Sequence, residues 1–351
     1  MEPTTLPVQL LALLKKHELT LDDSQPHIGG ERALLSPGKL VLMAKTTTNQ
    51  PVVVKYSITP AGAKEIAQEA KIRRLFEELP FSEQRFLLPR ILLHETSHSN
   101  NFLVSEFISQ TQVLQDYSLE QQFFMSIQSL ENQETFHTTT NEHSTYIRDH
   151  FEALTTKTYL QSLNDMIAAI IQQRPTLAPL LTAVQNSFYE HKSIINTFGG
   201  YLVHTDFVPH NFRITNNQFY LLDYVSFRIA NKYESWARYI NFMELHQPVL
   251  ARLLVSYLQE DRNEHEFTAF WLLRLYRLVF LLNYYCSIFE KTDDDLHVLT
   301  EARIVFWSDL LKNIYNKTSI PEELVTNYTK TRDGLRTETE KERQRTFTKA
   351  N

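Results

Sequence analysis

The spacing of apolar residues changes near residue 110, and this change limits the chain to few folds. Before it, short apolar runs alternate with turn residues, as in KLVLMAK (39–45), PVVVKYS (51–57) and NFLVSEFI (101–108). After it, apolar residues recur at helical spacing over long segments until about residue 316. Strands that come first and helices that follow are typical of an α+β protein. We therefore expect a two-lobed α+β fold, with a small antiparallel-sheet N-lobe and a larger, mainly helical C-lobe.

The first third of the chain predicts a leading helix and then a β-β-β-α-β-β order. Turn residues at 36–38 and 47–50 separate the first three strands, and helix-forming residues dominate the segment before Pro80. The predicted elements are a helix at 6–19, strands at 31–35, 39–45 and 51–57, a helix at 61–79, and strands at 90–96 and 101–108.

Later segments differ in composition. Helical spacing from about 115 to 198 is interrupted by the threonine-rich stretch 137–145, which predicts a loop. Two short apolar runs, YLVHTDF and QFYLLDYV, predict strands before helices resume. The end of the chain is charged and poor in large apolar residues, which predicts a disordered tail or a frayed helix. We expect an N-lobe at 1–108, a helical C-lobe at 109–328 and a tail at 329–351.

Composition argues against several classes of function. With 41 acidic and 35 basic residues the net charge is −6, so no overall positive field would recruit nucleic acid or an anionic membrane. Glu2 stands where a signal peptide needs basic residues, and the apolar run 270–289 contains Arg274 and Arg277, so we expect no signal peptide and no membrane span. A single cysteine, Cys286, favours a reducing, cytoplasmic compartment.

The residues that carry chemistry are concentrated in HTDFVPHN, which runs from His204 to Asn211, and in Asp223 twelve residues later. Phosphoryl transfer needs an oriented nucleophile and phosphates neutralised by metal. One carboxylate near a hydroxyl, with a second carboxylate and an amide oxygen on Mg²⁺, meets these needs. The same residue types are common in ordinary turns, so HxDxxxxN alone is only suggestive. Asp206 lies just after the apolar run YLV and Asp223 follows the apolar run YLL, which favours the functional interpretation.

HTDFVPHNFRI and the later LLDY resemble the HGDxxxxN and IDW/IDF segments of the aminoglycoside phosphotransferase and choline kinase-like superfamily, and Pro209 is part of the match. This resemblance implies a protein-kinase-like fold and a small-molecule kinase. Such an enzyme moves the γ-phosphoryl of Mg-bound ATP or GTP to a hydroxyl of a small molecule. By the resemblance, Asp206 is the catalytic residue that orients the hydroxyl, and Asn211 and Asp223 are metal ligands.

Two further residues of the same segment are assigned by this resemblance. His204 is expected to support the backbone of the loop. Thr205 stands where the family usually has glycine, which raises the question whether the local backbone angle is the same.

The resemblance also implies a lysine on the third strand, and Lys55 in PVVVKYS fits this place. Its ammonium would contact the α- and β-phosphates, whereas an isolated lysine at a strand end more often faces solvent. Such a lysine needs an acidic partner, and Glu65 and Glu69 lie one turn apart on one helix face. QEAKIRRLF resembles the family helix and favours Glu69. The alternative is a solvated glutamate paired with a nearby basic residue.

The phosphate-covering loop and the hinge are weaker matches. SPGK (36–39) has one glycine where protein kinases have three, so Ser36 and Gly38 are predicted phosphate contacts with a plain hairpin turn as the alternative. NFLVSEFISQ resembles the hinge between kinase lobes, which we expect near 105–111. The backbone from Glu106 to Ile108 is predicted to pair with the purine edge of the nucleotide.

Rival functions stay open. A catalytically silent kinase-like module that binds nucleotide or a protein fits the thin phosphate loop and Thr205. A protein kinase is disfavoured, because Asp223 is followed by Tyr and Val instead of Phe and Gly, and no APE motif is present. Family members phosphorylate aminoglycosides, choline, ethanolamine, sugars and amino-acid-like alcohols. The sequence points to none of these acceptors, because a fold does not fix a substrate.

Overall fold

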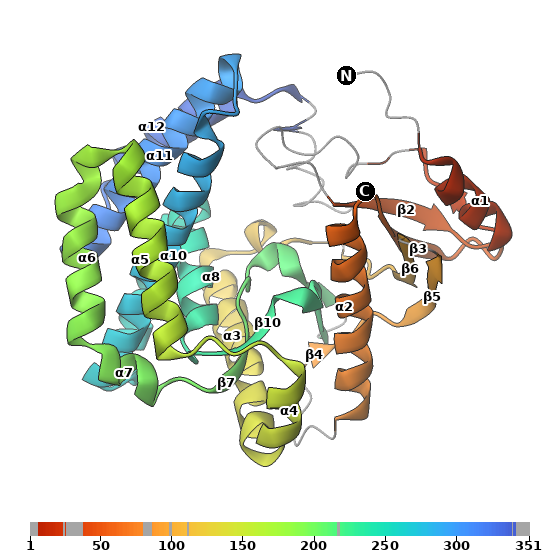
Figure 1. Cartoon of the computed structure of the whole chain (residues 1–351), viewed down its shortest axis with the longest axis horizontal. Helices are drawn as coiled ribbons and strands as arrows, with labels where there is room; N and C mark the ends of the chain where they lie inside the picture. Colours follow the sequence, from red (N-terminus) through yellow and green to blue (C-terminus); the bar gives the residue numbers. More distant parts are fainter. Residues whose placement is uncertain are drawn as a thin grey trace.

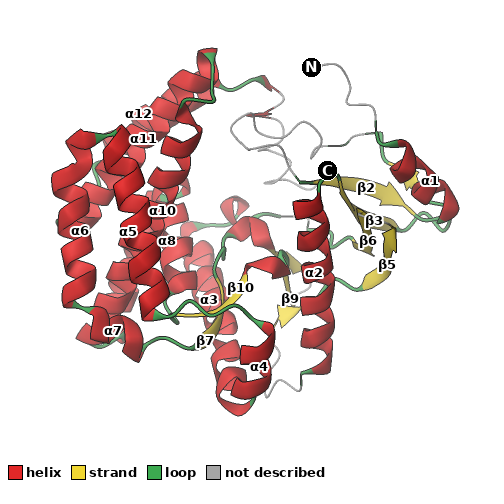
Figure 2. Cartoon of the chain, viewed as in Figure 1, coloured by secondary structure: helices red, strands yellow, loops and turns green. Residues whose placement is uncertain are grey.

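The computed structural model describes residues 6–23, 25, 38–79, 86–97, 100–110, 112–215, 218–338 and 340–341. A sheet with two helices forms one part, and a large group of helices forms the other (Figure 2). We call the part that ends with the last strand of this sheet, Asn100–Glu106, the sheet lobe, and the remainder the helical lobe. Residues 107–110 after that strand are neither helix nor strand, and the predicted lobe boundary at 108 lies among them.

The sheet lobe contains one antiparallel sheet of five strands in the order β1-β2-β3-β6-β5. Alternate side chains of β3, among them Val52 and Val54, are buried against helix α1, and helix α2 covers the other face through Ile66 and Ala70 (Figure 1). The elements are α1 (Val8–Lys16), β1 (Thr20–Leu21), β2 (Lys39–Lys45), β3 (Pro51–Ser57), α2 (Pro60–Glu78), β5 (Ile91–Ser97) and β6 (Asn100–Glu106).

Four of the five predicted strands and both predicted helices of this lobe are present with small shifts in their ends. The predicted strand at 31–35 lies outside the described residues. On the side of β2 away from β3, the described strand is the short β1, at Thr20–Leu21, which pairs with the end of β2. Two residues are too few for periodicity to predict.

Helices account for most of the helical lobe. Its core is one cluster of buried aliphatic and aromatic side chains, with Trp236 and Tyr239 of α8 fully buried in it. The helices are α3 (Leu119–Glu142), α4 (Ser144–His150), α5 (Thr156–Gln173), α6 (Ala178–Glu190), α7 (Lys192–Thr197), α8 (Glu234–His246), α9 (Pro248–Asp261), α10 (Glu264–Phe289), α11 (Asp294–Tyr315) and α12 (Glu322–Leu335), with short 3₁₀ turns η1 (Leu114–Asp116), η2 (Pro175–Leu177), η3 (Pro209–Asn211) and η4 (Tyr224–Ser226).

One sequence prediction for this lobe is wrong, and the structure decides between two alternatives in another. Helix α3 continues to Glu142, so most of the stretch 137–145 is helical and not a loop. The tail predicted from 329 as disordered or a frayed helix is helical at residues 329–335, because these continue α12. Val325, Tyr328 and Arg332 share one buried face of α12, so a helix with few large apolar residues still packs on its neighbour α11.

Helix α10 is the one described helix that is long and apolar enough to cross a membrane. However, 56% of its most apolar window is buried, and the helix packs against α5, α8 and α11. The core helix of a soluble protein has the same length and composition, so these properties are weak evidence for a membrane span.

Two small sheets hold the loops that carry the predicted site. β7 pairs antiparallel with β10, and a second sheet has the order β4-β9-β8. Because Phe227 is opposite His204 in the first pair, the loop after β7 lies beside the turn η4 that follows β9. The strands are β4 (Phe86–Leu87), β7 (Tyr201–His204), β8 (Phe212–Thr215), β9 (Gln218–Leu221) and β10 (Phe227–Ala230).

The start of β2 and the start of α2 approach each other through two glycines. The carbonyl of Gly38 accepts hydrogen bonds from the N–H groups of Ile58 and Thr59. A Cβ atom on Gly62 would lie 1.7 Å from this carbonyl oxygen, which no side chain can tolerate without a shift of the backbone. Gly62 is therefore required by close packing.

Replacing Gly62 with alanine is expected to lower the free energy of unfolding by about 2 kcal/mol, because the new methyl group overpacks the contact with Gly38. The midpoint of urea unfolding, followed by tryptophan fluorescence, measures this loss. Gly334→Ala is the matched control, since a Cβ there meets nothing within 4 Å and the position is helical. Equal midpoints for the two variants would contradict the packing argument.

Candidate active site

His204 connects the two loops of the predicted site. Its ring is fully buried, and its Nε2–H lies 3.1 Å from the carbonyl oxygen of Leu222 and 3.0 Å from that of Asp223. Carbonyls only accept, so Nε2 carries the proton and the imidazole holds the backbone at Asp223 in place. Burial lowers the pKa of His204, while the charges of Asp223 and Asp206 act in the opposite direction. Both carboxylates are therefore close to this ring.

Thr205 fits the place where glycine was expected. Its φ is not among the positive values of the described residues, so a threonine adopts this backbone without strain. The backbone N–H and the Oγ1 hydroxyl of Thr205 both donate to the carbonyl of Ser226 at 2.9 Å. The departure from the family pattern therefore adds a contact between the loop and η4.

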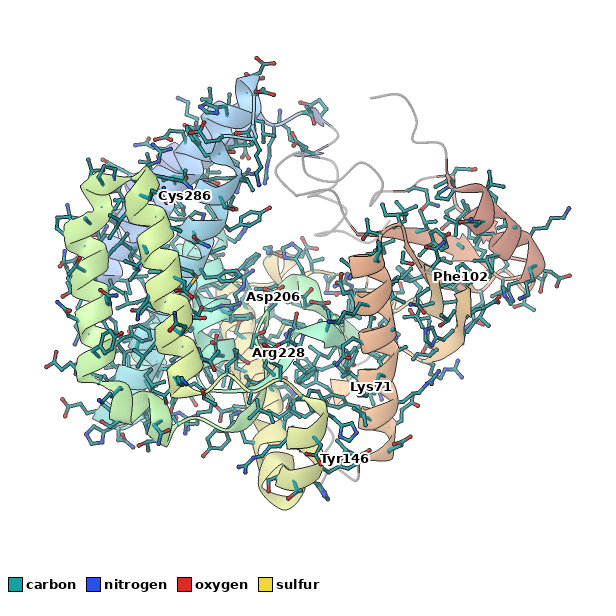
Figure 3. The ribbon with its side chains drawn as sticks, in the orientation of Figure 1. Lys71, Phe102, Tyr146, Asp206, Arg228 and Cys286 are labelled. Carbon is teal, nitrogen blue, oxygen red and sulfur yellow. The ribbon has the colours of Figure 1, made fainter. Side chains whose placement is uncertain are left out.

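Both carboxylate oxygens of Asp206 are held by neighbouring side chains. Arg238 of α8 donates its Nε–H to Oδ1 at 2.7 Å, and Asn211 donates its Nδ2–H to Oδ2 at 3.0 Å and to the Asp206 carbonyl at 2.8 Å. The Asp206 side chain keeps 39% of its surface exposed. In Figure 3 Asp206 lies between helix α2 and the helices of the helical lobe, whereas Cys286 lies well away from it.

The charge state of Asp206 follows from these contacts. Burial raises the pKa of its carboxyl, but the positive charges of Arg238 and Arg277 outweigh burial and hold the pKa well below its ordinary value. Asp206 is therefore a carboxylate at any pH near neutrality. Such a group accepts a hydrogen bond from a hydroxyl well but is a weak base for removing its proton.

Asp223 has a strained backbone that directs its side chain. Its φ of 57° and ψ of 57° are left-handed, which is uncommon for a residue with a side chain, although aspartate adopts this conformation more readily than most residues. Ser226 donates its hydroxyl to Oδ2 at 2.7 Å. Oδ1 of Asp223 and Oδ1 of Asn211 accept no hydrogen bond from the described residues.

These two oxygens are of the chemical type that magnesium prefers. Mg²⁺ prefers oxygen ligands, and it usually takes only one or two from protein because water and phosphate complete its shell. The described residues contain no group of three or more His, Cys, Asp or Glu side chains that would form a full protein cage. Asn211 and Asp223 together thus offer the kind of partial donor set that a nucleotide-bound metal uses.

Lys55 lies in a buried ionic network with α2. Its Nζ is 2.7 Å from both oxygens of Glu69, and Arg73 donates to the same carboxylate at 2.7 Å. Burial lowers the pKa of Lys55 although the charge of Glu69 opposes this. Glu65, the other candidate partner, pairs with Lys39 of β2 instead. Glu69 is therefore the residue that holds Lys55.

Arg73 links this network to the loop that carries Asp223. Its guanidinium lies 5.2 Å from the centre of the Tyr224 ring and donates to the Pro89 carbonyl at 3.0 Å. Tyr224 directly follows Asp223, so α2 positions Lys55 and contacts the predicted metal-binding loop at the same time. Sequence reasoning missed Arg73, although its spacing of four residues from Glu69 could have indicated an ion pair. It also missed Arg238, for which no local spacing gives a signal.

The remaining predicted contacts are less well placed. Ser36 lies outside the described residues, and the packing of Gly38 against Gly62 explains that glycine without a phosphate. The N–H of Glu106 donates to the Arg90 carbonyl at 3.0 Å, so it is not available to a purine. The N–H of Ile108 has no hydrogen-bond partner in the described part of the chain and is free for such a contact.

Comparison with known proteins gives no match by sequence, either to a family model or to a curated protein. Solved structures do match. The aminoglycoside phosphotransferase APH(2'')-Ib with bound ADP is 13% identical, and the match covers 91% of this chain and 99% of that one with a TM-score of 0.57. APH(4)-Ia with ADP and hygromycin B is 12% identical, with coverage of 89% and 99% and a TM-score of 0.61.

A third match is amicoumacin kinase hAmiN with AMP-PNP, Ca²⁺ and its ligand Ami, at 12% identity, coverage of 90% and 96%, and a TM-score of 0.58. Identities this low establish a shared fold. The chain therefore has the kinase-like fold of the aminoglycoside phosphotransferases, which confirms the fold implied by the HTDFVPHN segment.

Proposed function

We propose that this chain, which has the fold of small-molecule phosphotransferases, moves the γ-phosphoryl group of a Mg-bound nucleoside triphosphate to a hydroxyl of a small molecule. One observation carries the proposal: Asp206 is held as a carboxylate beside Asn211, while His204 ties its loop to Asp223. The solved structures with this fold that contain ADP or AMP-PNP support a nucleotide as the donor. ATP and GTP stay equal candidates.

Each residue of the site has a separate role in this proposal. Lys55, held extended by Glu69, binds the phosphates. Arg73 contacts both Glu69 and Tyr224 and so holds this pair next to the loop of Asp223. Oδ1 atoms of Asn211 and Asp223 would hold magnesium, which when bound neutralises phosphate charge. Asp206 accepts a hydrogen bond from the acceptor hydroxyl and so aligns it for in-line attack.

A catalytically silent module that binds nucleotide or a protein is the second candidate. One observation favours it, because Arg238 and Asn211 already occupy one position on each oxygen of Asp206. A carboxylate offers about four acceptor positions, however, so Asp206 retains capacity for an acceptor hydroxyl. Only the enzyme transfers a phosphoryl group, whereas nucleotide binding is compatible with both candidates.

Magnesium-dependent nucleotide binding tests the shared part of both candidates. ATP or GTP at about 100 times its Kd should stabilise the folded state by about 2.7 kcal/mol, which raises the thermal midpoint by a few degrees. In the wild type we expect this rise to require Mg²⁺. In Asp223→Asn we expect Mg²⁺ to make no difference to the midpoint measured with nucleotide. Thermal unfolding with and without Mg²⁺ measures it.

Asp165→Asn serves as control, because Asp165 is exposed on α5 and bonds only to Gln161 in the described structure. It should respond to Mg-nucleotide as the wild type does. If neither nucleotide shifts the wild type at millimolar concentration, the proposed function is wrong. If nucleotide binds but no acceptor or water is ever phosphorylated, the silent module is the better account.

A further inference from the structure

Arg238 presents unused hydrogen-bond donors directly beside Asp206. Its Nε–H is taken by Asp206 Oδ1 at 2.7 Å, and its side chain is 20% exposed. Its two Nη groups donate to no acceptor in the described part of the chain, and neither is a buried atom. Arg277 differs, because it donates to the Thr205 carbonyl and pairs with Glu234. Of these two arginines, Arg238 has both Nη groups unused by the described residues and the more exposed side chain, 20% against 13% for Arg277.

Packing holds Arg238 in this position. Arg238, Phe242 and His246 recur every four residues and so share one face of α8. The guanidinium of Arg238 lies 5.9 Å from the centre of the Phe242 ring, which in turn stacks on His246 at 4.1 Å. His210 of the catalytic loop packs edge-on against Phe242 at 5.2 Å. A stack of rings therefore supports the guanidinium from one side.

The charges that surround this stack are mainly basic. Burial and then the charges of other basic groups act on the rings of His210 and His246, and they lower the pKa of His246 to about 3. The arginines that act on these two rings are Arg213, Arg238, Arg332 and Arg336. Asp206 opposes them and is paired with Arg238, and Arg332 is paired with Asp333. The ring of His246 is neutral near pH 7, so the positive charge on this face comes from the arginines.

Resting on the proposed function, we infer that the Nη groups of Arg238 bind a carboxylate or phosphate of the acceptor, close to the hydroxyl that Asp206 aligns. A guanidinium presents its N–H groups as a planar fork that matches both anions. One guanidinium then joins the catalytic carboxylate to the anion, which fixes the distance between the anion and the reacting hydroxyl. The acceptor class is that of hydroxy acids and phosphorylated alcohols. A polycationic aminoglycoside would meet like charges instead.

A binding experiment tests this inference without any need for catalysis. Thermal unfolding is measured with D-glycerate, glycerol 3-phosphate, glycerol or choline, which differ in charge around a similar hydroxyl. We expect the two anions to raise the midpoint of the wild type, and glycerol and choline to leave it unchanged. Arg238→Gln should lose the response to the anions. Arg252→Gln, which removes an exposed arginine paired with Glu322 on another helix, should keep it.

Kinetics separate recognition from simple support of Asp206. With the anionic probe that binds best as acceptor, Arg238→Gln should raise KM roughly 10- to 100-fold, as expected for a lost charge-assisted hydrogen bond. Nucleotide hydrolysis with water as acceptor reports the loss of support for Asp206 alone, so the fall in kcat/KM with the anionic acceptor should exceed the fall in hydrolysis. Arg238→Lys keeps the positive charge without the planar fork of N–H groups, so it should recover part of the anion response. If Arg238→Gln does not fold, Arg238→Lys replaces it in the experiment.

Several outcomes would overturn the inference. They are an absence of any shift by either anion at tens of millimolar, an equal response to glycerol, and an anion response that survives in Arg238→Gln. Equal losses in Arg238→Gln with every acceptor and with water would leave Arg238 as a support for Asp206 alone. Each of these results is compatible with Mg-nucleotide binding, so the inference can fail while the proposed function stands. If the anions bind but no nucleotide binds, the proposed function fails although Arg238 still binds an anion.

Discussion

Asp206→Asn is expected to reduce kcat for phosphoryl transfer about 1,000-fold, in the range typical for loss of a positioned acid–base group. The substitution keeps the shape of the side chain but removes the charge that aligns the acceptor hydroxyl. Mg-nucleotide binding should survive, because the proposed metal ligands are Asn211 and Asp223. Nucleotide binding by thermal unfolding and turnover by release of the nucleoside diphosphate give the two readouts.

The pH dependence of the wild type gives an independent check on Asp206. Arg238 and Arg277 hold its pKa well below the ordinary value, against the effect of burial. Since the carboxylate is the working form, activity should fall only when the pH drops below that lowered pKa. We therefore expect no loss of kcat/KM from this group between pH 8 and about pH 5, as follows from linkage.

Two outcomes would contradict this role of Asp206. One is a variant that loses Mg-nucleotide stabilisation together with turnover, which would place Asp206 in nucleotide binding. The other is an Asp206→Asn variant with wild-type kcat, which would remove the residue from the reaction. Asp165→Asn, on the surface of α5, should keep both readouts and controls for the change of net charge.

The fold was largely predictable, since most of its long elements carry clear periodic signals. The misses are short or depend on tertiary contacts. β4 has two residues and β8 and β10 have four, too few for a period, and the pairing partners of β4 and β10 lie far away in sequence. The threonine-rich end of α3 reads as a loop by composition, yet the chain continues it as helix. Local propensity is a weak guide where packing decides.

The site was predictable only where residues are close in sequence. His204, Asp206 and Asn211 form one loop, so a single motif places them together. Periodicity could not choose between Glu65 and Glu69, because both lie on the same face of α2; the family resemblance favoured Glu69, and the structure pairs Glu69 with Lys55. Arg238 comes 32 residues after Asp206, and a contact over that distance leaves no local pattern.

Glu69→Gln is expected to destabilise the fold by about 3 kcal/mol at pH 7, the range found when one partner of a buried ion pair is removed. Glu69 is fully buried and accepts from both Lys55 and Arg73, so the variant leaves two buried cations without their counter-ion. Burial alone would raise its pKa, but the charges of Lys55 and Arg73 bring it down from 4.5 to about 2. This lowering corresponds to about 3 kcal/mol by linkage, in agreement with the first figure.

The sign of the pH dependence makes this prediction specific. The pKa of Glu69 is lower in the folded protein than in the unfolded chain, so its contribution is complete above about pH 4.5 and is lost as the pH falls toward about 2. Urea unfolding of wild type and Glu69→Gln should therefore differ most near neutral pH and converge in acid. Glu65→Gln removes the same charge one turn away, from a glutamate 41% exposed, and should cost less than about 1 kcal/mol. If the two variants are equally stable at pH 7, or if the gap for Glu69→Gln stays constant down to pH 3, the buried network does not hold α2 against Lys55.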